Sequence, residues 1–130
     1  FIFDIEEQTA IGAGPGMRLA LVDGKILLEH KYENPNVPQE GEGILFPRDQ
    51  WVNIRFEARL SQQKKGYVKV YQDDVLIIDQ KEWKTLPTDL LYARQGTQGR
   101  YSLIELGATA NPSKFDALMY VDDVSVEILQ

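Results

Sequence analysis

The residues best suited to bind a ligand alternate with apolar residues in two segments, 51–60 and 67–72. A period of two places alternate side chains on opposite faces of a strand. Pairing Ala58 with Val68 and Phe56 with Val70 gathers the apolar set on one face. The opposite face then carries Asn53, Arg55, Glu57, Arg59, Tyr67, Lys69 and Tyr71.

That mixture of rings, cations and amides is suited to sugar recognition. Flat rings pack on the C–H faces of pyranoses, and the polar groups bond hydroxyls in fixed directions. The pattern therefore predicts a ligand-binding face. The alternative is a solvated outer face whose cross-strand pairs contribute a few tenths of a kcal/mol each.

A further aromatic candidate, Trp83, lies in the polar stretch 81–84. An aromatic ring in such a stretch can serve as an exposed stacking platform, so we include Trp83 in the predicted ligand-binding set.

Acidic residues suggest one metal site. Asp123, from the pair Asp122-Asp123, and Asp4 could supply hard oxygen ligands for a structural Ca²⁺ if the two ends of the chain lie side by side. Adjacent residues on a strand point to opposite faces, so only one Asp of the pair can face the site. The alternative is a domain without any cofactor.

Catalytic groups are sparse, and no catalytic residue is predicted. Glycoside hydrolysis needs two carboxylates about 5 to 9.5 Å apart, whereas Glu105 stands alone and Glu57 lies among cations. A lyase needs a base such as Tyr or His beside cations, and Tyr67, Tyr71 and Arg55 are of the right types. The single histidine, His30, is expected at the surface or a sheet edge.

Composition narrows the classes of protein. The chain has 130 residues, no Cys, 14 basic and 20 acidic residues, and a formal net charge of -6. One domain is expected over residues 1–130. The absence of Cys excludes disulfide scaffolds and thiol chemistry. The acidity argues against nucleic acid and anionic membranes as partners.

Short β-prone segments separated by turns must position these residues. Strands are predicted at 1–5, 17–22, 25–32, 51–60, 67–72, 75–79, 101–107 and 117–129. Asp23-Gly24 and Asp73-Asp74 supply hairpin turns. No segment has the apolar spacing of an amphipathic helix, so an all-β antiparallel sandwich with little helix is predicted.

The segments WVNIRFEARLSQQKKGYVKVYQDDVLIID and LMYVDDVSVEI, within residues 17–130, resemble the concanavalin A-like lectin/glucanase superfamily. The likeness is to its polysaccharide-lyase-like and laminin-G-like jelly rolls. It implies that Trp51 packs near the sheet edge in a structural role. Two family features are absent, the E-x-D-x-x-E arrangement of the glucanases and the Q-x-H strand of the lyases. Some usual N-terminal strands are also missing, so the resemblance implies a compact version or strands supplied by a partner chain.

Together these observations predict a non-catalytic carbohydrate-binding module, extracellular or periplasmic, whose partner is a polysaccharide. Its cations favour uronates or sulfated sugars. The first alternative is a polysaccharide lyase, or a remnant of one, acting on uronate-containing glycans. The second is a structural or oligomerisation domain, a homo-oligomer that buries the Tyr/Arg face against another chain.

Overall fold

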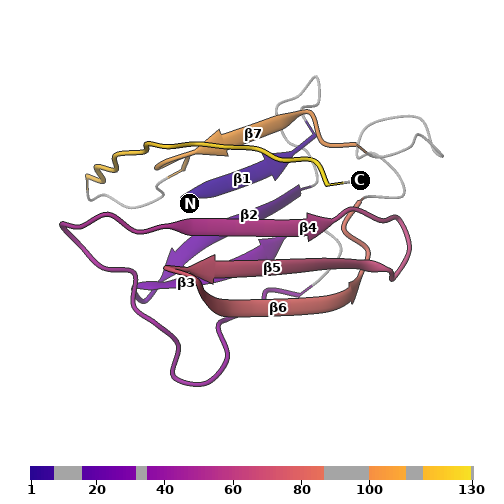
Figure 1. The fold of residues 1–130 in the computed structure, drawn as a ribbon, viewed down its shortest axis with the longest axis horizontal. Helices are drawn as coiled ribbons and strands as arrows, with labels where there is room; N and C mark the ends of the chain where they lie inside the picture. The colour runs from indigo at the N-terminus through magenta and orange to yellow at the C-terminus, as the bar shows by residue number, and fades with distance from the viewer. Residues whose placement is uncertain (8–15, 32–34, 87–99, 111–115, 130) are drawn as a thin grey trace.

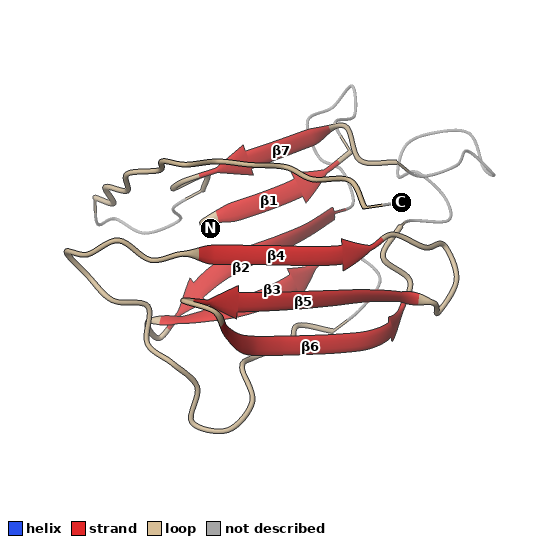
Figure 2. Cartoon of the chain, in the orientation of Figure 1, coloured by secondary structure: helices blue, strands red, loops and turns tan. Residues whose placement is uncertain are grey.

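The computed structural model describes residues 1–7, 16–31, 35–86, 100–110 and 116–129, which form two antiparallel sheets packed face to face (Figure 1). Figure 2 shows strands and loops but no helix in these residues. The prediction of an all-β antiparallel sandwich is confirmed. Within the same residues, no helix is long and apolar enough to cross a membrane.

The four-stranded sheet has the order β3-β2-β1-β7. Its strands are β1 (Phe3–Glu6), β2 (Gly16–Val22), β3 (Lys25–His30) and β7 (Leu103–Leu106). Asp23 and Gly24 join β2 to β3 with φ values of 50° and 74°. Two successive positive φ values are typical of the type I′ turn that matches strand twist, so the Asp-Gly turn is confirmed.

The three-stranded sheet is a meander of β4 (Ile54–Arg59), β5 (Gly66–Gln72) and β6 (Val75–Trp83). Ala58 pairs with Val68 and Phe56 with Val70, as the alternation predicts. Asp73 and Asp74 form the second turn, again with positive φ. β6 runs four residues beyond the predicted end at Asp79, and its register on β5 shifts twice.

The core lies between the sheets because alternate apolar side chains of each sheet point inward. Its fully buried members are Met17, Leu19, Ile26 and Leu28 from the four-stranded sheet and Val68, Val70 and Ile78 from the three-stranded sheet. Replacing Leu28 by Ala would remove buried surface and leave a cavity, at a cost of about 2 to 5 kcal/mol.

A tight contact fixes the turn between β4 and β5. The Thr85 hydroxyl donates to the carbonyl of Arg59 at 2.7 Å and accepts from the amide of Ser61 at 2.8 Å. A Cβ on Gly66 would lie 2.4 Å from that hydroxyl and 2.7 Å from the carbonyl oxygen of Trp83. Only glycine allows this close approach. The contact fixes the start of β5 and with it the positions of the side chains that follow Gly66.

One predicted strand is not found in the structure. Residues 116–129 form no strand with any described residue, although a final strand is predicted at 117–129. Most of their apolar side chains are exposed, and Met119 is partly buried. Residues 8–15, 87–99 and 111–115, which lie between predicted strands, are outside the described part of the chain.

Candidate functional site

The outer face of the three-stranded sheet is built in rows that cross its strands. Arg59, Tyr67 and Lys81 form one row. Glu57, Lys69 and Asp79 form the next, and Arg55, Tyr71 and Leu76 the third. Side chains at paired positions point to the same side of a sheet, about 5 Å apart. The sequence prediction that these residues share one face therefore agrees with the register.

This face is positive on an acidic protein. Its cations are Arg55, Arg59, Lys64, Lys65, Lys69 and Lys81, and its carboxylates are Glu57, Asp79 and Glu82. The three rows and the hollow thus hold six positive and three negative groups, a formal charge of +3, and the carboxylates of Asp73 and Asp74 at the opposite turn reduce this to +1, against -6 for the whole chain. The face can attract an anion that the net charge would repel.

Some of these charges are already paired. Arg55 contacts the carboxylate of Glu57 at 3.1 Å, and its guanidinium lies 3.9 Å from the centroid of the Tyr71 ring. Lys81 contacts Asp79 at 3.0 Å. Because Arg55 covers one side of Tyr71, only the other side of that ring can stack on a ligand.

Other cations remain available to a ligand. Arg59, Lys64, Lys65 and Lys69 form no ion pair with any residue that the structure describes. Lys69 instead places its ammonium 5.7 Å from the centroid of the Tyr67 ring. The uncompensated charge is therefore concentrated around Tyr67 and the turn that precedes β5.

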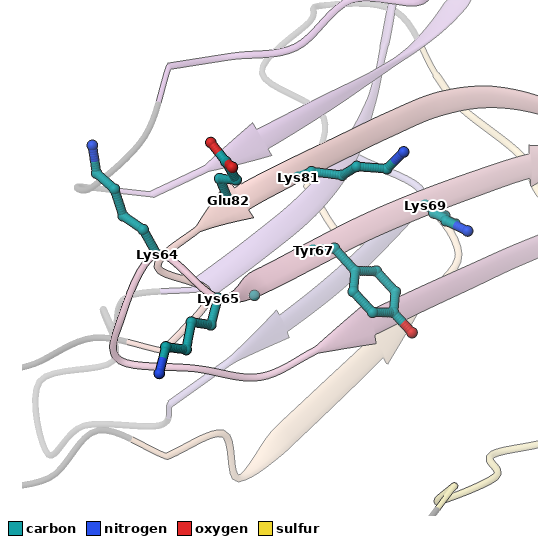
Figure 3. Close-up of a pocket in the computed structure, with 7 residues that line it drawn as sticks. Lys64, Lys65, Tyr67, Lys69, Lys81 and Glu82 are labelled. Atoms are coloured by element: carbon teal, nitrogen blue, oxygen red, sulfur yellow. The ribbon is translucent and has the colours of Figure 1, made fainter.

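A shallow hollow of about 310 Å³ lies at this end of the face. It is lined by Lys64, Lys65, Gly66, Tyr67, Lys69, Lys81 and Glu82. Figure 3 shows Tyr67, Lys69 and Lys81 projecting from the neighbouring strands β5 and β6, with Lys64 and Lys65 on the preceding turn. Gly66 lines the hollow with its backbone, because a Cβ there would point toward Thr85 and the carbonyl of Trp83. The hollow could hold an anionic group beside an aromatic ring.

The two tryptophans have positions opposite to those predicted. Trp83 is buried, with 6% of its surface exposed, and it packs into the core at the end of β6. The prediction of an exposed platform at Trp83 is therefore wrong. Trp51, predicted to be a packed structural residue, is 70% exposed. Trp51 lies two residues before Asn53 and four before Arg55, in step with the outer series. The alternation of the segment could therefore have predicted that Trp51 is exposed.

His30 is not at the surface, which corrects the prediction. It is 3% exposed at the end of β3, and its ring meets that of Trp83 edge-on, with 5.7 Å between centroids. Burial lowers the pKa of His30 to about 4. Because it faces the core between the sheets, His30 cannot act as a base at the outer face.

The proposed calcium ligands have different surroundings. Asp4 is buried, and its carboxylate lies 2.9 Å from the Lys31 ammonium, which also bonds Glu6. Burial raises the pKa of Asp4, although Lys31 acts against this. Burial lowers the pKa of Lys31, but Glu6 and Asp4 outweigh it and the net shift is upward. Asp123 is exposed, and among the described residues no group of three or more metal-ligating side chains gathers.

No family model, curated protein or solved structure matches this chain. The resemblance to concanavalin A-like jelly rolls therefore stays a prediction, and the case for function depends on the geometry of the face described above.

Proposed function

We propose that this domain is a non-catalytic carbohydrate-binding module that holds an acidic polysaccharide on the outer face of its three-stranded sheet. The observation that carries the proposal is the cluster of uncompensated cations around Tyr67, beside a hollow, on an otherwise acidic protein. Aromatic rings supply stacking surfaces, and the cations supply charge-assisted hydrogen bonds to carboxylate or sulfate groups.

The face suits an extended chain. Six paired positions along β4 and β5 extend over roughly 20 Å. Lys64, Lys65 and Tyr67 lie at one end and Lys69 lies in the middle row. Arg55, Tyr71 and Asn53 lie toward the other end. A polymer with regularly spaced negative groups can contact both ends at once, which a small anion cannot.

Affinity gel electrophoresis with alginate, polygalacturonate and heparin tests this proposal. We expect retardation by acidic glycans and none by a neutral glucan, and weaker retardation at high salt because exposed charges are screened. Tyr67→Ala and Lys69→Ala should each reduce affinity by roughly tenfold, the loss of one good contact. Arg100→Ala, which removes an exposed cation outside this face, is the matched control.

Two results would contradict the proposal. One is the absence of binding to any acidic glycan at millimolar concentration. The other is an equal loss of binding in Arg100→Ala and Lys69→Ala, which would indicate attraction to cations in general instead of a site.

A second candidate, a polysaccharide lyase, draws on the row that holds Tyr67. The phenol of Tyr67 lies between Arg59 and Lys81 in the sheet register. A β-elimination needs a base for the proton next to a uronate carboxylate, and a cation to neutralise that carboxylate. New absorbance from unsaturated uronate, lost in Tyr67→Phe, would identify a lyase. Binding without new absorbance supports the binding module.

A further inference from the structure

Residues 118–129 carry an exposed apolar surface that none of the described strands covers. Leu118, Tyr120, Val124, Val126, Ile128 and Leu129 are all exposed, Val126 at 69% and Ile128 at 91%. The segment is extended but pairs with no described strand. Such a concentration of exposed apolar side chains is typical of a surface that binds another protein.

The apolar residues follow the period of a strand. Asp123 has a φ of 51°, and its amide bonds the side chain of Asp122 at 2.8 Å, which breaks the chain direction there. Beyond this break Val124, Val126 and Ile128 alternate with Ser125 and Glu127. The stretch from Val124 to Ile128 therefore has the alternation of a β-strand, but it has no partner strand among the described residues.

Val121, in the middle of the segment, lies close to the four-stranded sheet. A side-chain carbon of Val121 lies 3.6 Å from the point where a Cβ of Gly107 would be, just past β7. Before it, Met119 is partly buried and Leu118 is 81% exposed; after it, every apolar side chain from Val124 to Leu129 is between 59% and 91% exposed. The half that carries the strand pattern is thus the half that the rest of the protein covers least.

Neither of two edge strands of the same chain, β4 and β7, is a good partner for this segment. Figure 1 shows residues 116–129 running in the same direction as β4, whereas every strand pair among the residues that the structure describes is antiparallel. β7 is four residues long. With Val121 beside Gly107, an antiparallel register would place Val126 and Ile128 beyond the end of β7.

We propose that the partner is a second copy of this chain, whose residues Val124–Ile128 pair antiparallel with the same residues across a two-fold axis at Val126. This register sets Val124 opposite Ile128 and Ser125 opposite Glu127, so apolar residues meet and no like charges face each other. A two-fold interface uses one patch twice, and that patch must be complementary to itself. The Val124–Ile128 stretch meets this requirement.

The available area suits a stable dimer. Each copy exposes seven large apolar side chains between Leu118 and Leu129. At roughly 100 Å² each they provide on the order of 700 Å². A standard interface buries about 800 Å² per partner. Strand pairing at Val126 with apolar packing on either side of it can reach this size.

Analytical ultracentrifugation over a dilution series tests the proposal. The chain should form a dimer, and Val126→Asp should weaken self-association by roughly 30-fold, as loss of a central interface residue does. Val75→Asp is the matched control, because Val75 is also an exposed valine, 50% exposed, at the first position of β6 in the other sheet. It should leave the dimer intact.

The lack of Cys allows a direct check of the register. Val126→Cys should form a disulfide-linked dimer on mild oxidation, because residues directly opposite in a ladder bring their Cβ atoms about 4.5 to 5.5 Å apart. Val75→Cys should not. A protein that stays monomeric at every concentration overturns the proposal, and so does a dimer that Val126→Asp leaves intact. A monomer whose melting temperature falls in Val126→Asp would instead show pairing within one chain.

Discussion

The two sheets use the same kinds of charged side chain in opposite ways. On the outer side of the four-stranded sheet, Lys31 contacts Asp4 and Glu6, and Arg18 contacts Glu29. The side chains of Lys31 and Asp4 are only 12% and 7% exposed. On the three-stranded sheet, Arg55 and Lys81 keep 52% and 67% of their side-chain surface exposed.

The difference separates charges that stabilise the fold from charges that are free to bind. A buried ion pair has lost its water and depends on its partner, whereas an exposed pair contributes little and can exchange its partner for a ligand. Residue type alone does not distinguish the two sheets. The two sheets differ in how deeply each cation is buried and in how many carboxylates lie beside it.

The largest expected effect comes from removing the cation of the buried cluster. Lys31→Met should lower the free energy of unfolding by about 3 to 5 kcal/mol, because it leaves Asp4 and Glu6 charged, buried and without their counterion. Urea denaturation followed by tryptophan fluorescence measures this. Lys81→Met, at the exposed pair with Asp79, should change the same quantity by less than about 1 kcal/mol. Equal losses would contradict the contrast between the sheets.

His30 should make stability depend on pH. Its pKa is about 4 in the folded protein and near the ordinary 6.5 when unfolded, so between these values the unfolded chain binds more protons. The free energy of unfolding should therefore fall as pH drops from about 6.5 to 4, by up to about 3 kcal/mol. Thermal melts across this range measure it. His30→Phe keeps a ring against Trp83 and should remove this part of the pH dependence, while carboxylates such as Asp4 still titrate.

Gly66 tests how the end of the binding face is fixed. Gly66→Ala would bring a methyl group within 2.8 Å of the carbonyl oxygens of Trp83 and Arg59, so we expect a loss of about 1 to 3 kcal/mol in stability. Gly41→Ala is a control in open space, where only the positive φ opposes the new side chain. A smaller loss at Gly66 than at Gly41 in denaturant titrations would show that the Thr85 contact is easily rearranged.

Much of the fold could be predicted because alternation is local. The pairing of Phe56 with Val70 follows from two hydrophobic patterns and one turn, and the register confirms it. Trp51 has the same spacing as Asn53 and Arg55 in the alternating segment 51–60, and it is exposed just before β4. The family resemblance pointed the other way for that residue, and the simpler local signal was correct.

The misplaced residues depend on contacts between distant segments. Trp83 sits among polar neighbours in the sequence, yet β6 continues to it and turns its ring toward the core, where it meets His30 from the other sheet. The burial of Trp83 and the burial of His30 do not follow from the local sequence pattern. Likewise, the sequence does not show that Asp4 has a counterion, because Lys31 comes to lie beside it only when β1 pairs with β2.

The smallest stability effect separates the two roles of charge most clearly. Glu57→Gln removes a carboxylate that contacts Arg55 on the exposed face, so stability should change by less than about 1 kcal/mol. The same change frees Arg55 and raises the charge of the face, and should therefore strengthen binding to an acidic glycan by about two- to fivefold. Glu29→Gln, which frees Arg18 on the other sheet, should not strengthen it. If both variants bind more tightly by the same factor, net charge and not this face governs the interaction.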